Sequence, residues 1–350
     1  MNWLPNINGQ TLIAGPCSAE TEEQLVGTAK EIAKDNRVTM LRAGIWKPRT
    51  RPGNFEGIGV EGLEWLRSAK QETSLPTCIE VANPDHVFNA LKYGVDLVWI
   101  GARTSANPFS VQEIAEALRG TDIDVLVKNP INPDLNLWAG AIERLDKVGI
   151  KNIGAIHRGF SKYQVVKYRN DPQWQIPIQL KQELPDLVMI GDPSHLGGRR
   201  SVLSELAQQA LDLNYNGLMI ESHLSPDKAW SDAKQQVTPS DLTKLIDRLV
   251  YREESGATAE TKLKTLRESI TDLDREVLEL LCQRMEVARS IGQIKKENKM
   301  TILQSDRWKE VKNETTKLGV ENGLSDSFLS DYLSAIHEES ISQQTKVMNE

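Results

Sequence analysis

Four side chains in this chain have the chemistry of a shared metal site. Cys17, His195, Glu221 and Asp232 supply a thiolate, an imidazole and two carboxylates. Such a mixture of donors suits a borderline divalent cation, with manganese preferred and iron, cobalt or zinc as alternatives. Each residue alone has an ordinary explanation, because a single cysteine usually packs in a core and a single histidine usually makes hydrogen bonds. The metal prediction therefore depends on whether the fold brings the four together.

A second group of reactive residues is cationic. The chain as a whole carries a net charge of −7, so a concentration of cations needs a specific reason. Guanidinium groups pair with phosphate and carboxylate through two hydrogen bonds, so the group predicts two anionic substrates or one with several anionic groups. The alternative is a set of salt bridges that stabilise the fold. The residues are Arg42, Lys47, Arg49, Arg103, Lys128 and Arg158.

Most of these side chains stand at the ends of short apolar runs. Eight such runs recur between Thr11 and Leu224, as expected for buried parallel strands. With helical segments between them, they predict the α/β class and a (β/α)8 TIM barrel, in which reactive groups lie at the carboxyl ends of the strands. We therefore expect an enzyme. The runs are 11–18, 39–47, 77–83, 96–103, 124–129, 152–158, 187–195 and 217–223.

The segments between the runs repeat apolar residues every three or four positions, which predicts helices. A closing helix is expected over 239–251, with Thr238 or Ser240 as its cap. The segment 160–184 is long and irregular, and we interpret it as a loop over the barrel mouth. The clearest predicted helices are 19–34, 60–70, 111–118 and 202–213.

Composition narrows the class of protein. The chain has 350 residues with 39% hydrophobic and 26% charged, and a barrel of about 250 residues leaves room for a smaller second domain. The negative net charge argues against nucleic-acid or membrane binding. No run reaches membrane-spanning length, and the first residues do not resemble a signal peptide. Cys17, Cys78 and Cys282 show no zinc-type spacing, which predicts reduced thiols and a cytoplasmic protein.

The last part of the chain has a different pattern. We expect the barrel over 1–251, a small polar linker over 252–260 and a separate all-α three-helix domain over 261–350. A near-heptad stripe from Leu263 to Ile291 predicts one helix of roughly 35 residues, and such lengths favour pairing with a second chain. We expect a homodimer formed through this domain. The two further helices are predicted at 306–317 and 326–347.

The barrel region resembles a known family. The motifs at 15–18, 41–50, 100–104, 128–129, 157–159, 192–195 and 221–223 are similar to those of type I 3-deoxy-D-arabino-heptulosonate-7-phosphate (DAHP) synthases. This resemblance implies condensation of phosphoenolpyruvate with erythrose 4-phosphate, the first step of the shikimate pathway. The related 3-deoxy-octulosonate 8-phosphate synthases have a different sequence at 47–50, so LysProArgThr favours the four-carbon aldose phosphate.

The resemblance also implies roles for residues. Cys17, His195, Glu221 and Asp232 would bind the metal. Glu80 would orient the water, and Lys47 would donate a proton to the new alkoxide. The phosphate of phosphoenolpyruvate would be held by Arg103, Lys128 and Arg158, its carboxylate by Arg42, Lys47 and Lys128, and the aldose phosphate by Pro48, Arg49 and Thr50.

The helical domain has its own cations. Arg284 and Lys295 are eleven residues apart and share a helix face, whereas Arg267 lies roughly 100° around the helix and is better placed to reach a partner chain. Ser340 and Gln344 are one helical turn apart. From the pattern alone, a dimerisation module is the simpler interpretation.

The motifs at 266–275, 283–284, 295, 306–307 and 340–344 resemble the all-helical chorismate mutases. This implies an intertwined dimer that rearranges chorismate to prephenate without a cofactor. Arg267, Arg284 and Arg307 would bind carboxylates, and Lys295 and Gln344 would face the ether oxygen, with Ser340 beside them.

Gln304 and Trp308 depart from that family's pattern and leave a second possibility, a catalytically weak or dead regulatory and dimerisation module. The short N-terminal segment leaves no room for another regulatory domain. We therefore expect allosteric feedback, in which chorismate or prephenate bound to the helical domain restrains the barrel.

Overall fold

The chain forms two compact units. The computed structural model describes residues 3–47, 53, 55–162, 167–252 and 260–349. Contacts within the chain divide it into Met1–Glu254 and Ser255–Glu350.

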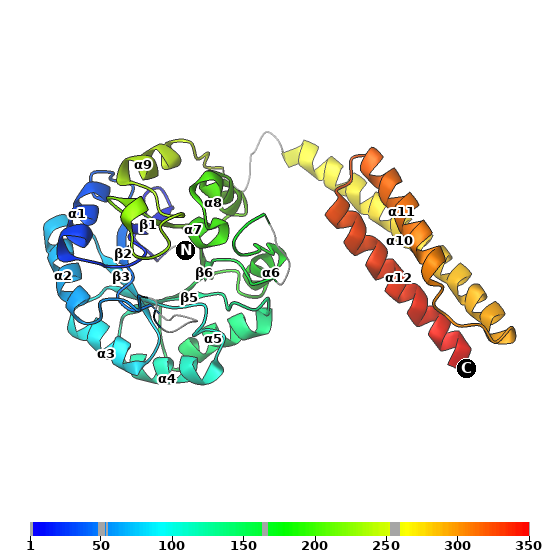
Figure 1. The fold of residues 1–350 in the computed structure, drawn as a ribbon, viewed down its shortest axis with the longest axis horizontal. Coiled ribbons are helices and arrows are strands. Elements are labelled where there is room, and N and C mark those ends of the chain that lie inside the picture. Colours follow the sequence, from blue (N-terminus) through cyan, green and yellow to red (C-terminus); the bar gives the residue numbers. More distant parts are fainter. Residues whose placement is uncertain (1–2, 48–52, 54, 163–166, 253–259, 350) are drawn as a thin grey trace. The chain divides into compact units, whose positions relative to one another are not determined.

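The first unit is a closed barrel of eight parallel strands in sequence order, surrounded by helices (Figure 1). This confirms the predicted (β/α)8 fold. The barrel closes where β1 pairs with β8, in a register that sets Gly15 beside Glu221. The strands are β1 (Thr11–Gly15), β2 (Met40–Ala43), β3 (Thr77–Val81), β4 (Leu97–Ile100), β5 (Asp124–Lys128), β6 (Ile153–His157), β7 (Val188–Gly191) and β8 (Gly217–Glu221).

Two apolar layers hold the barrel together. Inside it, Trp99 and Met219 belong to one buried cluster, and Leu4 from the N-terminal segment packs on the same cluster. Outside it, a larger cluster lies between the strands and the apolar faces of the helices. The interior is therefore filled with side chains and leaves the carboxyl ends of the strands as the place for chemistry.

The outer helices begin where the sequence supplies caps. Thr21, Asn83, Asn107 and Asp134 each accept a backbone N–H from the first turn of the helix that follows. The helices are α1 (Glu22–Ile32), α2 (Glu61–Thr73), α3 (Pro84–Lys92), α4 (Pro108–Leu118), α5 (Leu135–Lys147), α6 (Gln175–Glu183), α7 (Pro193–Gly197), α8 (Leu203–Asp212) and α9 (Pro239–Asp247). Short 3-10 turns lie at Arg200–Val202 and Pro226–Lys228.

Two sequence expectations need correction. The segment 160–184 is not a loop throughout, because its second half forms α6, whose Pro177 falls in the first turn where a proline is tolerated. The closing helix is capped by Thr238 rather than Ser240 and ends at Asp247, before the predicted 251. After it, Val250 exchanges hydrogen bonds with the side chain of Gln208 on α8, which draws the backbone out of the helix.

The second unit consists of three helices, as predicted. They are α10 (Glu260–Glu297), α11 (Ser305–Glu321) and α12 (Asp326–Asn349). The 38-residue α10 packs along α12, and α11 also contacts α12. In the part of the chain that the structure describes, none of the helices has the combination of length and apolar character that a bilayer crossing requires.

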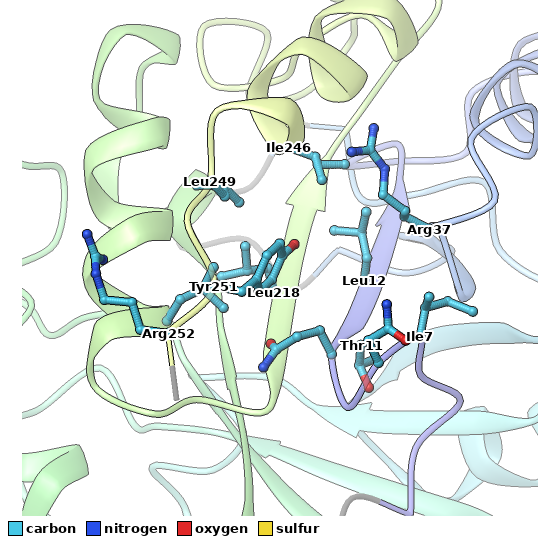
Figure 2. A pocket seen from close by; sticks show the side chains of 12 residues that line it. Ile7, Thr11, Leu12, Arg37, Leu218, Ile246, Leu249, Tyr251 and Arg252 are labelled. Atoms are coloured by element: carbon cyan, nitrogen blue, oxygen red, sulfur yellow. The ribbon is translucent and has the colours of Figure 1, made fainter. Parts of the chain in front are cut away.

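A pocket of about 360 Å³ lies at the amino ends of β1 and β8 (Figure 2). Leu12 and Leu218 line it from the two strands, Ile246 from α9 and Tyr251 from the segment that follows. It is at the opposite end of the strands from the predicted reactive residues, so it does not belong to the candidate site.

Candidate active sites

The barrel site begins with Cys17, two residues beyond β1. Its thiol donates to Asp232 Oδ2 over 3.3 Å, and Lys47 Nζ lies 2.8 Å from the same sulfur. The backbone of Cys17 packs directly against Gly44, where a side chain would not fit, because a Cβ there would lie 2.1 Å from the carbonyl oxygen of Cys17. Burial, reinforced by Glu221, raises the pKa of Cys17 to about 12. The thiol is therefore protonated at neutral pH, and a metal ion that binds it must displace the proton.

His195 is oriented by a carboxylate at the end of β7. Asp192 caps α7 through the backbone N–H of His195, and its Oδ2 lies 2.8 Å from His195 Nδ1. The other ring nitrogen, Nε2, lies 3.6 Å from Glu221 Oε1. Burial lowers the pKa of His195, which keeps the ring neutral. A neutral imidazole held by a carboxylate on its far side is the usual form of a metal-binding histidine.

Glu221 is fully buried at the end of β8. Its Oε2 accepts from Gln235 Nε2 at 2.7 Å, whereas Oε1 lies 3.4 Å from Arg42 Nη2 and accepts no hydrogen bond from the described residues. Burial would raise the pKa of this carboxyl, but His195, Arg42 and Lys47 lower it. A buried carboxylate oxygen without a hydrogen-bond donor is an atom that a cation would satisfy.

The four predicted metal ligands thus lie in one network of pairwise contacts. They do not yet surround a common point, because among the described residues no three His, Cys, Asp or Glu side chains are arranged to hold a metal ion. The donor set and the buried oxygen of Glu221 fit a divalent cation, while the four side chains contact one another in pairs, Cys17 with Asp232 and His195 with Glu221.

Two of the predicted anion-binding residues are placed against Trp99. The guanidinium of Arg42 lies 5.1 Å from the ring centroid and the ammonium of Lys128 lies 5.5 Å from it. Lys128 also pairs with Asp192 at 2.8 Å. These contacts hold both cations at the mouth of the barrel and limit the cost of burying them.

Arg158 follows β6 directly. Its backbone N–H donates to Asn129 Oδ1 at 2.7 Å and its Nη1 donates to Asn170 Oδ1 at 3.0 Å. Burial lowers the pKa of Arg158 to about 10, so it remains charged at neutral pH. A charged guanidinium whose backbone is fixed on a neighbouring strand end is well suited to bind an anion.

The remaining barrel residues are placed less closely. Glu80 Oε2 accepts from Trp99 Nε1 at 3.2 Å, and Gly101 leaves space for this carboxylate because a Cβ there would lie 2.0 Å from Oε1. Arg103 follows β4 and is exposed. The predicted aldose-phosphate residues Pro48, Arg49 and Thr50 lie outside the described residues.

The helical unit contains a cavity of about 290 Å³ between its helices. Arg284 Nη1 donates to Ser340 Oγ. Lys295 Nζ donates to Gln344 Oε1 at 3.1 Å and to the carbonyl of Ile302 at 2.6 Å, and all three side chains from Lys295, Ser340 and Gln344 are buried. The structure therefore brings these four predicted residues to one cavity.

Two other predicted residues are placed differently. Arg307 lines the cavity but is largely exposed and pairs with Glu310. Arg267 is exposed on α10 and does not line the cavity. Trp308 stacks on His337 with ring centroids 3.8 Å apart, and both line the cavity together with Gln304.

Four residues at the barrel mouth were missing from the predicted site. Asp192 had a signal, since it ends an apolar run beside His195. Arg169, Asn170 and Gln235 had none, because they belong to irregular connections in which no periodicity shows where a side chain points.

Comparison with known proteins gives the same division of the chain. The model of the DAHP synthetase I family matches residues 7–254, and the model of the type II chorismate mutases matches residues 266–345. The matched segments correspond to the barrel and to the helical unit.

Individual relatives resemble the barrel. The phospho-2-dehydro-3-deoxyheptonate aldolase of Thermotoga maritima is 33% identical over 228 residues, which cover 65% of this chain and only 65% of that enzyme. The crystal structure of the Thermotoga DAHP synthase has a TM-score of 0.60 at 30% identity and covers 69% of this chain and 68% of its own. The 2-dehydro-3-deoxyphosphooctonate aldolase of Nitratidesulfovibrio vulgaris is 26% identical and covers 68% of this chain and 90% of that enzyme.

The buried position of Asp192 leads to a stability prediction. Asp192→Asn leaves Lys128 buried without its counter-charge and should lower the free energy of unfolding at pH 7 by about 3–5 kcal/mol. Although burial alone would raise it, the pKa of Asp192 is held well below its usual value by His195 and Lys128. A carboxyl whose pKa is lower in the folded than in the unfolded state stabilises the fold at pH values above its unfolded-state pKa. The difference in unfolding free energy between wild type and Asp192→Asn should therefore persist from pH 7 to about 5 and narrow below about 4.

Urea unfolding followed by tryptophan fluorescence measures this difference. Asp122→Asn is the control, because the ion pair of Asp122 with Lys151 is exposed and its removal should cause no measurable loss. Equal stabilities of the two variants at pH 7 would contradict the prediction.

Proposed function

The chain belongs to the DAHP synthetase I family, and on this premise we propose that its barrel condenses phosphoenolpyruvate with erythrose 4-phosphate to form DAHP. We also propose that the helical domain, which matches the type II chorismate mutases, rearranges chorismate to prephenate. The chain would then be a bifunctional enzyme of aromatic amino acid biosynthesis. Its three cysteines form no disulfide, which supports a location in the cytoplasm.

One observation carries the proposal for the barrel: cations converge at the carboxyl ends of the strands on a protein that is acidic overall. Arg42, Lys47, Arg103, Lys128 and Arg158 stand at or just beyond the carboxyl ends of β2, β4, β5 and β6, and Arg169 lies beside Asp232. Cations gathered at one end of a barrel attract two phosphorylated substrates and hold them against their mutual repulsion.

A metal ion completes this proposal. Cys17, His195, Glu221 and Asp232 would hold a divalent cation, with manganese preferred and iron, cobalt or zinc as alternatives. When bound, such an ion supplies Lewis-acid polarisation of the aldehyde of erythrose 4-phosphate. The buried, neutral His195 and the unsatisfied oxygen of Glu221 support this assignment.

Other side chains of the barrel would bind the anionic groups of the two substrates. Lys128, Arg158 and Arg103 bind the phosphate of phosphoenolpyruvate, and Arg42, Lys47 and Lys128 bind its carboxylate. The aldose phosphate binds at Pro48, Arg49 and Thr50. Carbon 3 of the enolpyruvate then attacks the aldehyde carbon, and water adds at carbon 2. The resulting tetrahedral intermediate releases inorganic phosphate, which leaves the ketone of DAHP at carbon 2.

Two groups would move protons in this reaction. Glu80, near the end of β3, orients the water, since a hydrogen bond from Trp99 on β4 already fixes its carboxylate. Lys47 gives a proton to the new alkoxide, since its Nζ lies beside the sulfur of Cys17 among the proposed metal ligands.

The choice of aldose phosphate is directly testable. The intact chain supplied with manganese should consume phosphoenolpyruvate with erythrose 4-phosphate at least about 100-fold more efficiently, in kcat/KM, than with arabinose 5-phosphate. Removal of metal with a chelator should abolish the rate, and added manganese should restore it. Preference for arabinose 5-phosphate would instead indicate an octulosonate 8-phosphate synthase.

The cavity of the helical domain supports the second activity. Lys295 and Gln344 are buried side by side and lie near Arg284, which suits a reaction that needs cations for carboxylates and donors to a developing negative charge on oxygen. Arg307 would assist in binding a carboxylate from the exposed edge. No nucleophile is required.

We propose that this domain pairs with a second copy of the chain. One face of α10 leaves large apolar side chains exposed, among them Leu266 and Leu280 at 62% and 63%. Contiguous exposed apolar surface of this kind marks an interface. Arg267 stands on the same helix outside its own cavity, and we propose that it completes the cavity of the partner subunit.

Mixed dimers test this shared site. Arg267→Ala and Arg284→Ala homodimers should each lose mutase activity, measured as chorismate loss by absorbance. A dimer with one chain of each kind, isolated with two different tags, has one intact site and should recover roughly half of the wild-type rate. A dimer of a wild-type chain with an Arg267→Ala/Arg284→Ala chain has the same number of substitutions but no intact site, and should stay inactive.

Equal rates for the two mixed dimers would contradict a shared site. A specific observation also favours an alternative, since Trp308 stacked on His337 occupies one wall of the cavity where the family usually has a smaller polar residue. If wild-type and Arg284→Ala chains consume chorismate equally slowly, the helical domain is a regulatory and dimerisation module instead.

We further propose that the helical domain regulates the barrel. The two reactions are not consecutive, so transfer of an intermediate between them does not account for the fusion, whereas feedback does. Chorismate or prephenate bound at Arg284 and Lys295 should lower the rate of DAHP formation.

The rate of DAHP formation measured against added prephenate tests the feedback. We expect a saturable decrease that the Arg284→Ala chain does not show. A flat response of the wild-type enzyme would exclude feedback by prephenate.

A further inference from the structure

The connection between β6 and α6 returns to the barrel mouth through residues 167–172. The last two residues of this segment are fixed by hydrogen bonds. Phe160 and Asp171 exchange backbone hydrogen bonds of 2.8 and 2.9 Å, and the buried ring of His157 contacts the carbonyl of Pro172 at 2.7 Å through Nε2. This holds Arg169 and Asn170 in a defined place between the strand ends.

Arg169 contacts one carboxylate of the proposed metal set directly and is linked to the other through Gln235. Its Nη1 donates to Asp232 Oδ1 at 2.8 Å and to Gln235 Oε1 at 2.7 Å. Gln235 in turn donates to Glu221 Oε2 at 2.7 Å. One guanidinium therefore determines the direction of Asp232 directly and supports that of Glu221 through one amide.

Asp232 needs such support because its backbone is unfavourable. Its φ of +49° is in the left-handed region of backbone conformations, which residues other than glycine seldom adopt. Backbone strain of this kind persists only where surrounding contacts enforce it. The ion pair with Arg169 helps to hold Asp232 in this conformation, and a hydrogen bond of 3.3 Å from the thiol of Cys17 is a second, uncharged contact.

The neighbouring Asn170 connects the other half of the site. Its Oδ1 accepts from Arg158 Nη1 at 3.0 Å, and its Nδ2 donates to the carbonyl of His195 at 2.7 Å. Its backbone N–H also donates to the carbonyl of Leu196 at 3.1 Å. A single amide thus joins a proposed phosphate-binding guanidinium to the helix turn that carries His195.

Glycines on both sides allow this close packing. Gly159 has a φ of +81°, and a Cβ there would lie 2.9 Å from the Cβ of Asn170. Gly198 has a φ of +67°, and a Cβ there would lie 2.5 Å from the Cβ of Arg169. The two residues are held too closely to be incidental surface contacts.

We propose that Arg169 and Asn170 are positioning residues that set the metal-binding carboxylates and the phosphate-binding Arg158 in one fixed relation. The inference rests on the proposed DAHP synthase function and adds to it two residues that touch neither substrate nor metal. Arg169 acts through Asp232 and Gln235, and Asn170 acts through Arg158 and the backbone of His195.

Manganese titration of the metal-free chain by calorimetry tests the role of Arg169. Arg169→Ala should weaken manganese binding about 10- to 100-fold, the usual effect of losing a residue that orients a metal ligand. Arg169→Lys keeps the charge but has a shorter side chain without the planar, fixed donor geometry of a guanidinium, and should bind with intermediate affinity. The side chain of Arg169 is 47% exposed, so neither change should unfold the barrel, and thermal unfolding of the metal-free chains checks this.

The role of Asn170 is tested by kinetics at saturating metal. Asn170→Ala should raise KM for phosphoenolpyruvate about 10-fold while KM for erythrose 4-phosphate changes by less than about 2-fold. Of the two side-chain hydrogen bonds lost, to Arg158 and to the carbonyl of His195, the one that involves a charged group is at the proposed phosphate site. Arg119→Ala is the control for both experiments, because Arg119 pairs with Glu116 on the exposed end of α4. It should leave manganese affinity and both KM values unchanged.

The outcomes separate this inference from the proposed function. If the wild-type chain binds no manganese and forms no DAHP, the proposed function fails and the inference fails with it. If the wild-type chain does both, while Arg169→Ala and Arg169→Lys bind manganese as it does and Asn170→Ala keeps its KM, only the inference is overturned. Graded weakening from wild type to lysine to alanine, with a KM change confined to phosphoenolpyruvate, supports it.

Discussion

The closure of the barrel between β1 and β8 is the constraint on which the candidate site depends. Five residue pairs join the two strands, and the last of them sets Gly15 beside Glu221. Cys17 leaves β1 two residues later and therefore lies near the carboxylate that ends β8. The β8–α9 connection adds Asp232, and β7 adds His195 from the other side of β8. Residues from the two ends of the barrel sequence thus meet because parallel strands that close a barrel end at the same face.

Burial of charge then determines the order of the site. Asp192, Glu221, Arg42 and Lys128 are all withdrawn from water, and an isolated charge in such a place is strongly unfavourable. Groups of opposite charge are therefore paired, Lys128 with Asp192 and Arg42 with Glu221, and the neutral ring of His195 also contacts Asp192. In the proposed function, the cations of this network exchange a protein carboxylate for the anionic group of a substrate.

The helical domain follows a different principle. Its cavity lies between helices of a single chain, and buried Lys295 is compensated by the carbonyl of Ile302 and the amide of Gln344 rather than by a carboxylate. In the proposed function, the side chain of Lys295 therefore remains available to an anionic ligand. The apolar face of α10 remains exposed in one chain, which is why the proposed function of this domain includes a second copy.

The sequence by itself determined the eight strands, the helical domain and most of the residues at the strand ends, because apolar runs and helical repeats are local properties. It also placed Arg284 and Lys295 on one face, since helical periodicity fixes that relation over eleven residues. Tertiary structure alone decided that Asp192 stands between Lys128 and His195, and that Arg169 meets Asp232 from 63 positions away. The contacts of Asp192 join the ends of two strands that are 64 positions apart in the sequence, a relation that no local repeat records. The contact of Arg169 arises between irregular connections, where only the packing of the surrounding strands and glycines selects a side chain's partner.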